Sequence, residues 1–397
     1  MFFSNLLLSL SDWVHYALRM VHLVAGVMWI GNSFYFMWLD SSLTVPEPKR
    51  DGVESELWMV HSGGFYCVER RRIEVGSFPS VLHWFKWEAT FTWISGFLLL
   101  GWLYYLHAAL TLVEPGRTPF LPGGAVAASI LTLLGSWYIY DGLWRTPWAK
   151  AKPEAASLLS FGLICALIGE LFWAFPGKAA FIHLGAVFGT IMVTNVWVHI
   201  LPSQQQMIDA TREGRQPNYE LSKVAKRRST HNSYMTLPVL LVMISNHFAT
   251  AFGSAHSAWI LLLLVLLGGG IRHWMIKGMS VARWLVPLLL LLVAALVDLT
   301  LPSGGSVRST VVPFSEVKQI VSQRCVVCHS AHPLDATFGP TPGGVSFEDP
   351  VQIQRLAPRI LIRAVQTKTM PLANKTQITD AERDTLGSWI AQGAKND

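Results

Sequence analysis

Apolar runs of bilayer length recur along residues 13–300 and constrain the fold more than any other feature. A helix of roughly 20 apolar residues crosses the ~30 Å hydrocarbon core of a membrane. Only 14% of the residues are charged, whereas soluble domains carry roughly 25%. The predicted fold class is therefore all-α, a polytopic transmembrane bundle of about eight helices. We expect the helices near residues 13–38, 82–106, 122–142, 155–175, 179–201, 234–253, 255–276 and 281–300.

Basic residues gather in alternate connections between these runs. The connections rich in Lys and Arg are 40–81, 143–154, 202–233 and 272–283. Because basic loops stay in the cytoplasm, an even number of helices returns the C-terminus to the outside. The net charge of +6 then reflects topology in a lipid bilayer, and we expect no nucleic-acid partner.

The composition changes after residue 301, where a mixed polar and apolar segment of small-domain size begins. It contains Cys325, Cys328 and His329 in the spacing C-x-x-C-H, which is typical of covalent haem c attachment. A zinc site would need a second ligand pair, and the two other cysteines lie far away in the sequence. His329 is the expected proximal iron ligand. One haem c per chain would place this segment on the outer side of an energy-transducing membrane.

Met370 is the expected distal iron ligand, because a thioether some forty residues after the motif suits Met/His ligation. His332 is the alternative, but it lies too close in sequence to His329 to cross the porphyrin easily. We expect a helix from Phe314 to Arg324 and a terminal helix capped near Thr379. The predicted domains are a transmembrane domain (1–301), a linker (302–312) and a small soluble α-helical cytochrome c domain (313–397).

Ionisable and polar side chains inside the apolar runs, or directly before them, form two predicted groups. Such residues cost free energy in a membrane and often mark functional sites. The group expected at the cytoplasmic side is His83, Lys86, Glu88, Arg228, His231 and Asn232. The group expected at middle to outer depth is His22, His183 and His247, which are candidate ligands of a buried b-type haem. The alternative is that the cations anchor helix ends and the histidines only pack.

Several strings resemble the bacterial membrane-bound urate oxidases (urate hydroxylases) with a fused C-terminal cytochrome c domain. The strings are His61–Tyr66, Leu82–Glu88, Thr92–Gly96, His183–Met192 and Arg228–Asn232, continuing to His247. The sequence departs from that pattern at His231-Asn232-Ser233, where a second Asn is expected. More weakly, His22–Gly31 is similar to the first helix of copper-resistance and protoporphyrinogen-oxidase membrane proteins, in which the matching histidine ligates haem.

The resemblance implies an oxidoreductase that converts urate to 5-hydroxyisourate without making hydrogen peroxide. It implies electron transfer through haem c to a soluble cytochrome c or a cytochrome oxidase. The expected location is the bacterial inner membrane, with the haem domain in the periplasm. Lys86 and Arg228 are expected to bind the urate anion, His83, His231 or Glu88 to act as the base, and Asn195 and Asn232 to bind the ring carbonyls.

Two other functions fit the same residues. A quinol–cytochrome c oxidoreductase would also need histidines in the membrane and a fused haem c. A non-enzymatic, membrane-anchored cytochrome c electron carrier would need neither a substrate nor a buried haem.

Overall fold

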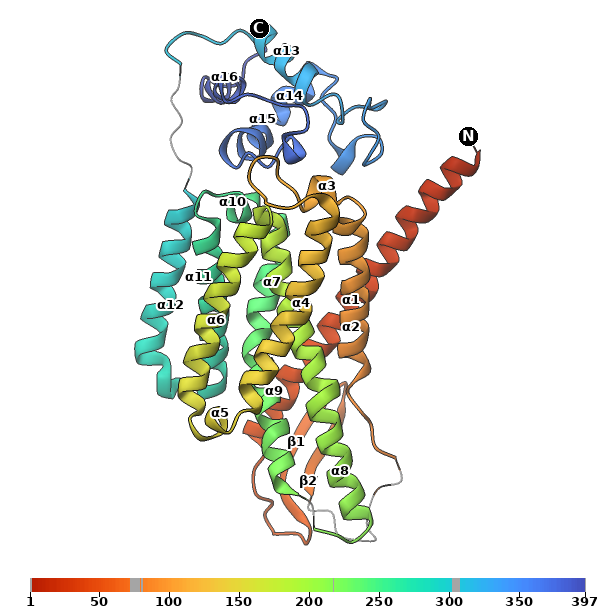
Figure 1. Ribbon diagram of the computed structural model, residues 1–397. Helices are drawn as coiled ribbons and strands as arrows, with labels where there is room; N and C mark the ends of the chain where they lie inside the picture. Colours follow the sequence, from red (N-terminus) through yellow and green to blue (C-terminus); the bar gives the residue numbers. More distant parts are fainter. Residues whose placement is uncertain (1, 72–78, 80, 217, 302–307, 397) are drawn as a thin grey trace.

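The computed structural model describes residues 2–71, 79, 81–216, 218–301 and 308–396. Over these residues the chain forms a long helix bundle with a smaller helical domain at one end (Figure 1). The predicted all-α, polytopic fold class is confirmed. Residues 302–307, which lie in the predicted linker, fall outside the described residues.

Eight long helices build the bundle: α1 (Phe2–Ser42), α2 (Trp87–Leu100), α4 (Pro122–Arg145), α6 (Pro153–Ala174), α7 (Gly177–Thr194), α9 (Tyr219–Ile244), α11 (Ser257–Lys277) and α12 (Met279–Thr300). Shorter elements connect or extend them: η1 (Gly101–Tyr105), α3 (Ala108–Thr111), α5 (Pro147–Ala151), η2 (Asn195–Ile200), α8 (Leu201–Arg212), η3 (Ser245–His247) and α10 (Ala249–Phe252). Among the described residues, six helices are long and apolar enough to cross a membrane. Helix α2 is shorter, with 14 residues, and α9 begins with a charged segment.

Two segments predicted as loops contain regular structure. Residues 40–81 include an antiparallel hairpin of β1 (Val53–His61) and β2 (Gly64–Arg71). The hairpin turns at Ser62 and Gly63, and both have positive φ angles. Residues 202–233 are largely helical, because α7 continues through η2 into α8 and α9 already starts at Tyr219.

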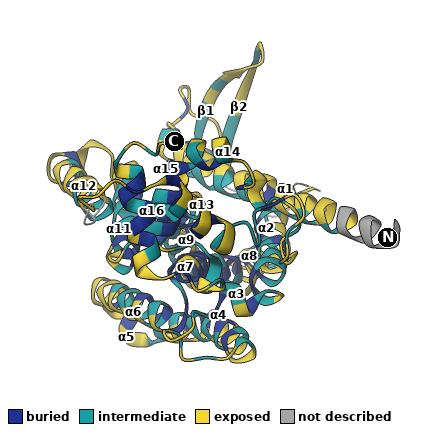
Figure 2. Cartoon of the chain, turned by 90° about the horizontal axis from the view of Figure 1, so that it is seen from above, coloured by how far each residue is buried: buried dark blue, intermediate teal, exposed yellow. Residues whose placement is uncertain are grey.

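Helix α7 lies at the centre of the bundle, where burial is greatest. Its buried residues include Phe181, Leu184 and Phe188, and they share one core with residues of α4, α6, α9 and α11. Figure 2 shows this central position, with exposed residues concentrated on the outer helices. Helix α2 packs along α1 and contacts α7, whereas α9 packs against both α7 and α11. Polar side chains on α7 are therefore enclosed by protein.

The C-terminal domain contains α13 (Phe314–Arg324), η4 (Pro342–Gly344), α14 (Pro350–Arg355), α15 (Ala357–Ile360), η5 (Leu361–Gln366), η6 (Leu372–Asn374) and α16 (Asp380–Ala391). Thr379 and Glu382 form a capping box at the start of α16, as the sequence predicts. Val312 is buried in this domain's core and its N–H donates to Gln392. The folded domain therefore begins before residue 313.

The C-terminal domain and the β-hairpin lie at opposite ends of the bundle (Figure 1). We call these the domain end and the hairpin end. The described parts of the two longest basic connections, 40–81 and 202–233, are both at the hairpin end. This separation agrees with the arrangement that the loop charges predict.

Candidate functional site

The C-x-x-C-H segment forms a helical turn directly after α13. The N–H of His329 donates to the carbonyl of Cys325 at 2.9 Å, and both cysteines are unbridged. Nδ1 of His329 lies 3.2 Å from the carbonyl oxygen of Val345. That contact leaves Nε2 as the nitrogen available to a metal, an orientation typical of metal-ligating histidines. Two thiols and one oriented imidazole therefore fit a covalently attached haem.

The loop that carries Met370 is held beside this motif by hydrogen bonds. The N–H of Met370 donates to the carbonyl of Arg363, and its own carbonyl accepts from the buried Arg383 at 2.9 Å. Further along the loop, Arg324 donates to the carbonyl of Thr376 at 2.6 Å, and the Thr376 hydroxyl donates back at 3.0 Å. The structure thus brings the predicted distal ligand and the attachment motif into one folded unit.

A second site centres on Asp141, a buried carboxylate on α4. Arg228 donates to its Oδ1 at 2.7 Å, His199 contacts the same oxygen at 2.6 Å, and Arg145 binds Oδ2 at 2.6 Å. Arg228 is 2% exposed and Asp141 is 6% exposed. Burying a guanidinium is costly unless its charge is compensated, and Asp141 supplies that compensation.

Four further polar side chains continue this cluster toward α7 and α9. Asn195 donates to the Tyr140 hydroxyl at 3.0 Å and to Oδ1 of Asn232 at 2.9 Å. The Tyr140 hydroxyl lies 2.8 Å from Nδ1 of His231, whose ring packs against Trp144. The Arg228 guanidinium lies over the Tyr140 ring at 4.9 Å. We call Tyr140, Asp141, Asn195, His199, Arg228, His231 and Asn232 the Arg228 cluster.

Two buried atoms of the Arg228 cluster lack hydrogen-bond partners. They are Nη1 of Arg228, a charged donor, and Oδ1 of Asn195, an acceptor. Unpaired buried polar atoms are rare because each costs about 1–3 kcal/mol. A ligand that offers both an acceptor and a donor would satisfy them.

The remaining predicted residues of this group, His83, Lys86 and Glu88, lie at the start of α2. The Lys86 ammonium is 5.6 to 5.7 Å from the rings of Trp84, Trp87 and Trp197. Trp197 of η2 donates a hydrogen bond to Thr90 of α2. Asn195, in the same turn of η2, donates instead to side chains of α4 and α9. The structure therefore divides the six predicted residues between two sides of η2. Oε2 of Glu88 is also buried without a partner.

A cavity of 1630 Å³ runs from the C-terminal domain into the bundle. Its wall includes Met370 at the domain end and Met192 of α7 at the other end. Between them the cavity follows α7 from Gly177 to Met192, which corresponds to about 20 Å of helix rise. The cavity ends beside the Arg228 cluster, because Asn232 donates to the Met192 carbonyl at 2.9 Å. It therefore extends from Met370 to the neighbourhood of the Arg228 cluster.

Two of the three histidines predicted to bind a buried haem, His22 and His247, line this cavity. The structure places His183 elsewhere. Its Nε2 lies 2.6 Å from the Ser129 hydroxyl and its Nδ1 lies 2.7 Å from the Ala179 carbonyl. Since both ring nitrogens are hydrogen-bonded and the ring stacks on Phe175, His183 is a packing residue in this arrangement.

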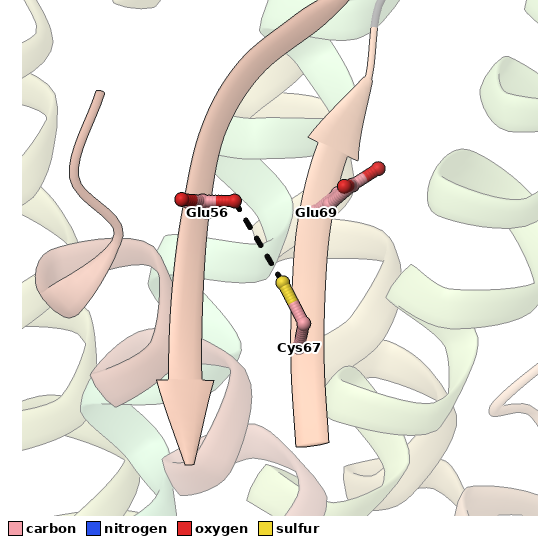
Figure 3. A group of neighbouring side chains, drawn as sticks. All are labelled: Glu56, Cys67 and Glu69. Carbon is pink, nitrogen blue, oxygen red and sulfur yellow. Dashed lines mark hydrogen bonds between the residues drawn. The ribbon is translucent and has the colours of Figure 1, made fainter. Parts of the chain in front are cut away.

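A third polar group, Glu56, Cys67 and Glu69, lies between the two strands of the hairpin (Figure 3). Its ligand atoms lie within 4.8 Å of one another, as metal ligands do. However, Arg50 binds both carboxylates, reaching Glu69 at 2.7 Å. Arg71 also lies 3.5 Å from Glu69, so two arginines offset the two negative charges that would attract a metal.

Sequence analysis missed Tyr140 and Asp141. The usable signal was Asp141 itself, a carboxylate at the end of the apolar run 122–142. Its partner Arg228 is 87 residues away in the sequence, so the pairing depends on the folded arrangement of α4 and α9.

Residues 8–301 match the family model described as urate oxidase N-terminal. This range covers the bundle, including the Arg228 cluster and both cavity histidines. No curated protein and no solved structure matches the chain.

Proposed function

The chain belongs to the urate oxidase N-terminal family, and from this premise we propose that it is a membrane-bound, cytochrome-linked urate oxidase. The proposed reaction is urate + H2O → 5-hydroxyisourate + 2 H⁺ + 2 e⁻. Water supplies the added oxygen, so no hydrogen peroxide is formed. The two unpaired atoms of the Arg228 cluster, beside a cavity that leads to Met370, are the observation that supports this proposal most directly.

Urate suits the Arg228 cluster because its rings alternate N–H donors with carbonyl acceptors and carry a negative charge at neutral pH. Nη1 of Arg228 would donate to an anionic oxygen or nitrogen, and Oδ1 of Asn195 would accept a ring N–H. Such a charge-assisted hydrogen bond is worth about 1.5–3 kcal/mol. Asn232 accepts a hydrogen bond from Asn195 and donates one to the Met192 carbonyl. It thereby orients the Asn195 amide that would bind urate.

Proton removal is assigned to Tyr140 and His231. The Tyr140 hydroxyl accepts a hydrogen bond from Asn195 and lies 2.8 Å from Nδ1 of His231. The Tyr140 hydroxyl can therefore pass a proton to the His231 imidazole. At the same time it contacts the Asn195 amide, which would bind the urate ring. His231 then acts as the base through Tyr140. His83, Lys86 and Glu88 form a separate group at the start of α2, and the proposal gives them no part in the proton transfer.

The electron acceptor in this proposal is haem c, held covalently by Cys325 and Cys328 and ligated by His329 and Met370. When bound, haem c supplies one-electron transfer to a soluble cytochrome c or a cytochrome oxidase. The proposed location of the C-terminal domain is the periplasmic side of a bacterial inner membrane, on the side opposite the basic loops. The opposite positions of this domain and the basic connections support that location.

Anaerobic reduction by urate tests the proposal. Purified wild-type protein should show reduction of its haem c absorbance when urate is added, and a quinol analogue should not replace urate. Arg228→Lys keeps the charge but loses the two-pronged guanidinium, so kcat/KM for urate should fall by about 10- to 100-fold. Arg227→Lys, on the neighbouring residue of α9, is the matched control and should keep the wild-type value. A haem c that stays oxidised with urate contradicts the proposed function.

A further inference from the structure

The cavity has an apolar interior that suits a flat, hydrophobic cofactor. Its deep walls include Trp29, Ile30, Leu103, Ile182, Val239 and Met243. These side chains come from α1, η1, α7 and α9, so the space lies between helices. A cavity of 1630 Å³ is larger than most small-ligand pockets, which span about 300–1,000 Å³.

His22 is fixed so that one nitrogen can bind a metal. Its Nδ1 lies 2.9 Å from the Thr92 carbonyl and 3.2 Å from the Ser95 hydroxyl. The imidazole therefore has its Nδ1 hydrogen directed at that carbonyl and its Nε2 lone pair unoccupied. Gly96 allows the ring to approach α2, since a Cβ there would lie 2.8 Å from Cε1 of His22.

His247 reaches the cavity from a different side, following the last turn of α9 in η3. Among the described residues, its ring has no hydrogen-bond partner, so both of its nitrogens are available. Two histidines from separate helices are a common axial pair for haem iron, because neutral imidazole is a good iron ligand.

Cations gather at the domain end of the cavity. Arg19, Lys178 and Arg363 all line it, and the first and third lie close enough to Lys178 to repel its charge. The carboxylates that also line the cavity are engaged elsewhere: Glu114 binds Arg117 and Asp380 binds Lys368. This end of the cavity therefore favours an anionic group.

We propose that the cavity binds one b-type haem, with His22 and His247 as iron ligands and Arg19, Lys178 and Arg363 facing its two propionates. Protoporphyrin is flat and apolar at its centre and carries both carboxylates on one edge. That shape matches an apolar space with a cationic end. Arg19 lies three residues before His22 on α1, roughly 4.5 Å nearer the domain end, as this orientation requires.

On the proposed function, a second haem would also match the number of electrons that each urate molecule releases. Urate gives up two electrons, and one haem iron accepts only one. A chain with haem b and haem c could hold both electrons from a single urate molecule. The cavity lies between the Arg228 cluster and Met370, where such an acceptor would shorten the path.

A pyridine haemochrome spectrum of the purified full-length protein tests the proposal without using urate. It counts b- and c-type haem separately, and we expect one of each per chain. His22→Ala and His247→Ala should each remove haem b and leave haem c. His256→Ala is the control, because His256 caps α11 outside this histidine pair, and it should keep both haems.

Gly189→Trp is a second variant that touches neither proposed ligand. Gly189 lines the cavity and a Cβ there would meet nothing within 4 Å, so the indole should fill the space and exclude haem b. Gly101→Ala, which also has open space at its Cβ, controls for losing a glycine. A wild-type protein with haem c alone overturns the proposal, as does full haem b in both histidine variants. If the wild-type protein lacks haem b and urate still reduces its haem c, the proposed function stands and this inference fails.

Discussion

Asp141 is the residue on which the Arg228 cluster depends. It contacts Arg228, His199 and Arg145, and only Arg145 is substantially exposed, at 60% of its side chain. Without the carboxylate, Arg228 would remain a buried charge with no compensation. Losing the ion pair with the buried Arg228 should therefore destabilise the protein strongly, whereas losing the ion pair with the exposed Arg145 should have a small effect on stability.

Replacing Asp141 with Asn should destabilise the protein by about 3–5 kcal/mol, because it leaves the buried guanidinium uncompensated. Arg145→Gln removes the exposed partner of the same carboxylate, and exposed ion pairs contribute about 0–1 kcal/mol. Thermal unfolding in detergent, followed by helical circular dichroism, compares the two. Equal effects from both variants would contradict the assigned role of Asp141.

Individual site residues were predictable where their side-chain chemistry was unusual for their surroundings. Arg228, His231 and Asn232 were identified because they are polar residues in or beside an apolar run and belong to strings that resemble the urate oxidases. His183 met the same criterion, yet Ser129 and the Ala179 carbonyl occupy its nitrogens. The sequence shows which residue type stands at such a position, but its hydrogen-bond partners can come from distant segments. A histidine that binds a metal and a histidine that only packs therefore cannot be distinguished from the sequence.

Two segments of the C-terminal domain are joined by an ion pair. Asp335 follows the C-x-x-C-H turn, Lys375 follows Met370, and their side chains bind each other. Lys375 and Thr337 hold the pKa of Asp335 well below its usual range. Because the folded pKa is lowered, this pair stabilises the domain above about pH 4 and is lost as the pH falls further.

Asp335→Asn should lower the stability of the domain at neutral pH by up to about 1 kcal/mol, as expected for a partly exposed pair. The difference from wild type should shrink below about pH 4, where Asp335 begins to be protonated in the unfolded chain while the folded state still holds it ionised. Urea unfolding followed by haem-region circular dichroism measures both. Asp384→Asn removes an exposed carboxylate from α16 and serves as the control. A wild-type advantage that is unchanged at about pH 3 would exclude this pair as its source.

Helix positions were predictable because apolar runs and Pro or Gly boundaries are local signals. The run at 281–300 became α12 (Met279–Thr300). The start of α9 was not predictable in this way, since its charged first turns pack through Arg228 against Asp141 on another helix. The hairpin was missed because its strands span only 9 and 8 residues and do not alternate regularly in burial, and because the segments around them are basic and resemble a loop.

On the scale of the molecule, the C-terminal domain rests on α10. A Cβ on Gly253 would lie 2.5 Å from Cβ of Thr367 and 2.7 Å from Cγ2 of Thr369. Arg363 lies over the Phe252 ring at 5.8 Å. Glycine at this point therefore permits the segment before Met370 to approach the bundle closely.

Gly253→Val should push the domain away from the bundle. On the proposed function, it should slow the urate-driven reduction of haem c by about 10- to 100-fold. Reduction by dithionite, which reaches the haem from solution, should keep its wild-type rate. Gly269→Val in α11, where an added Cβ meets nothing within 4 Å, is the control. A wild-type urate rate in Gly253→Val would show that this contact does not control electron transfer.

The placement of the Arg228 cluster and the C-terminal domain at different depths has an energetic consequence in a respiring cell. On the proposed function, each electron released by urate moves outward, away from a cytoplasm that is electrically negative. Moving one charge through the full field is worth about 2.3 kcal/mol per 100 mV. The membrane voltage would therefore drive purine oxidation forward, and uncouplers that collapse the voltage should slow it even when oxygen and substrate are plentiful.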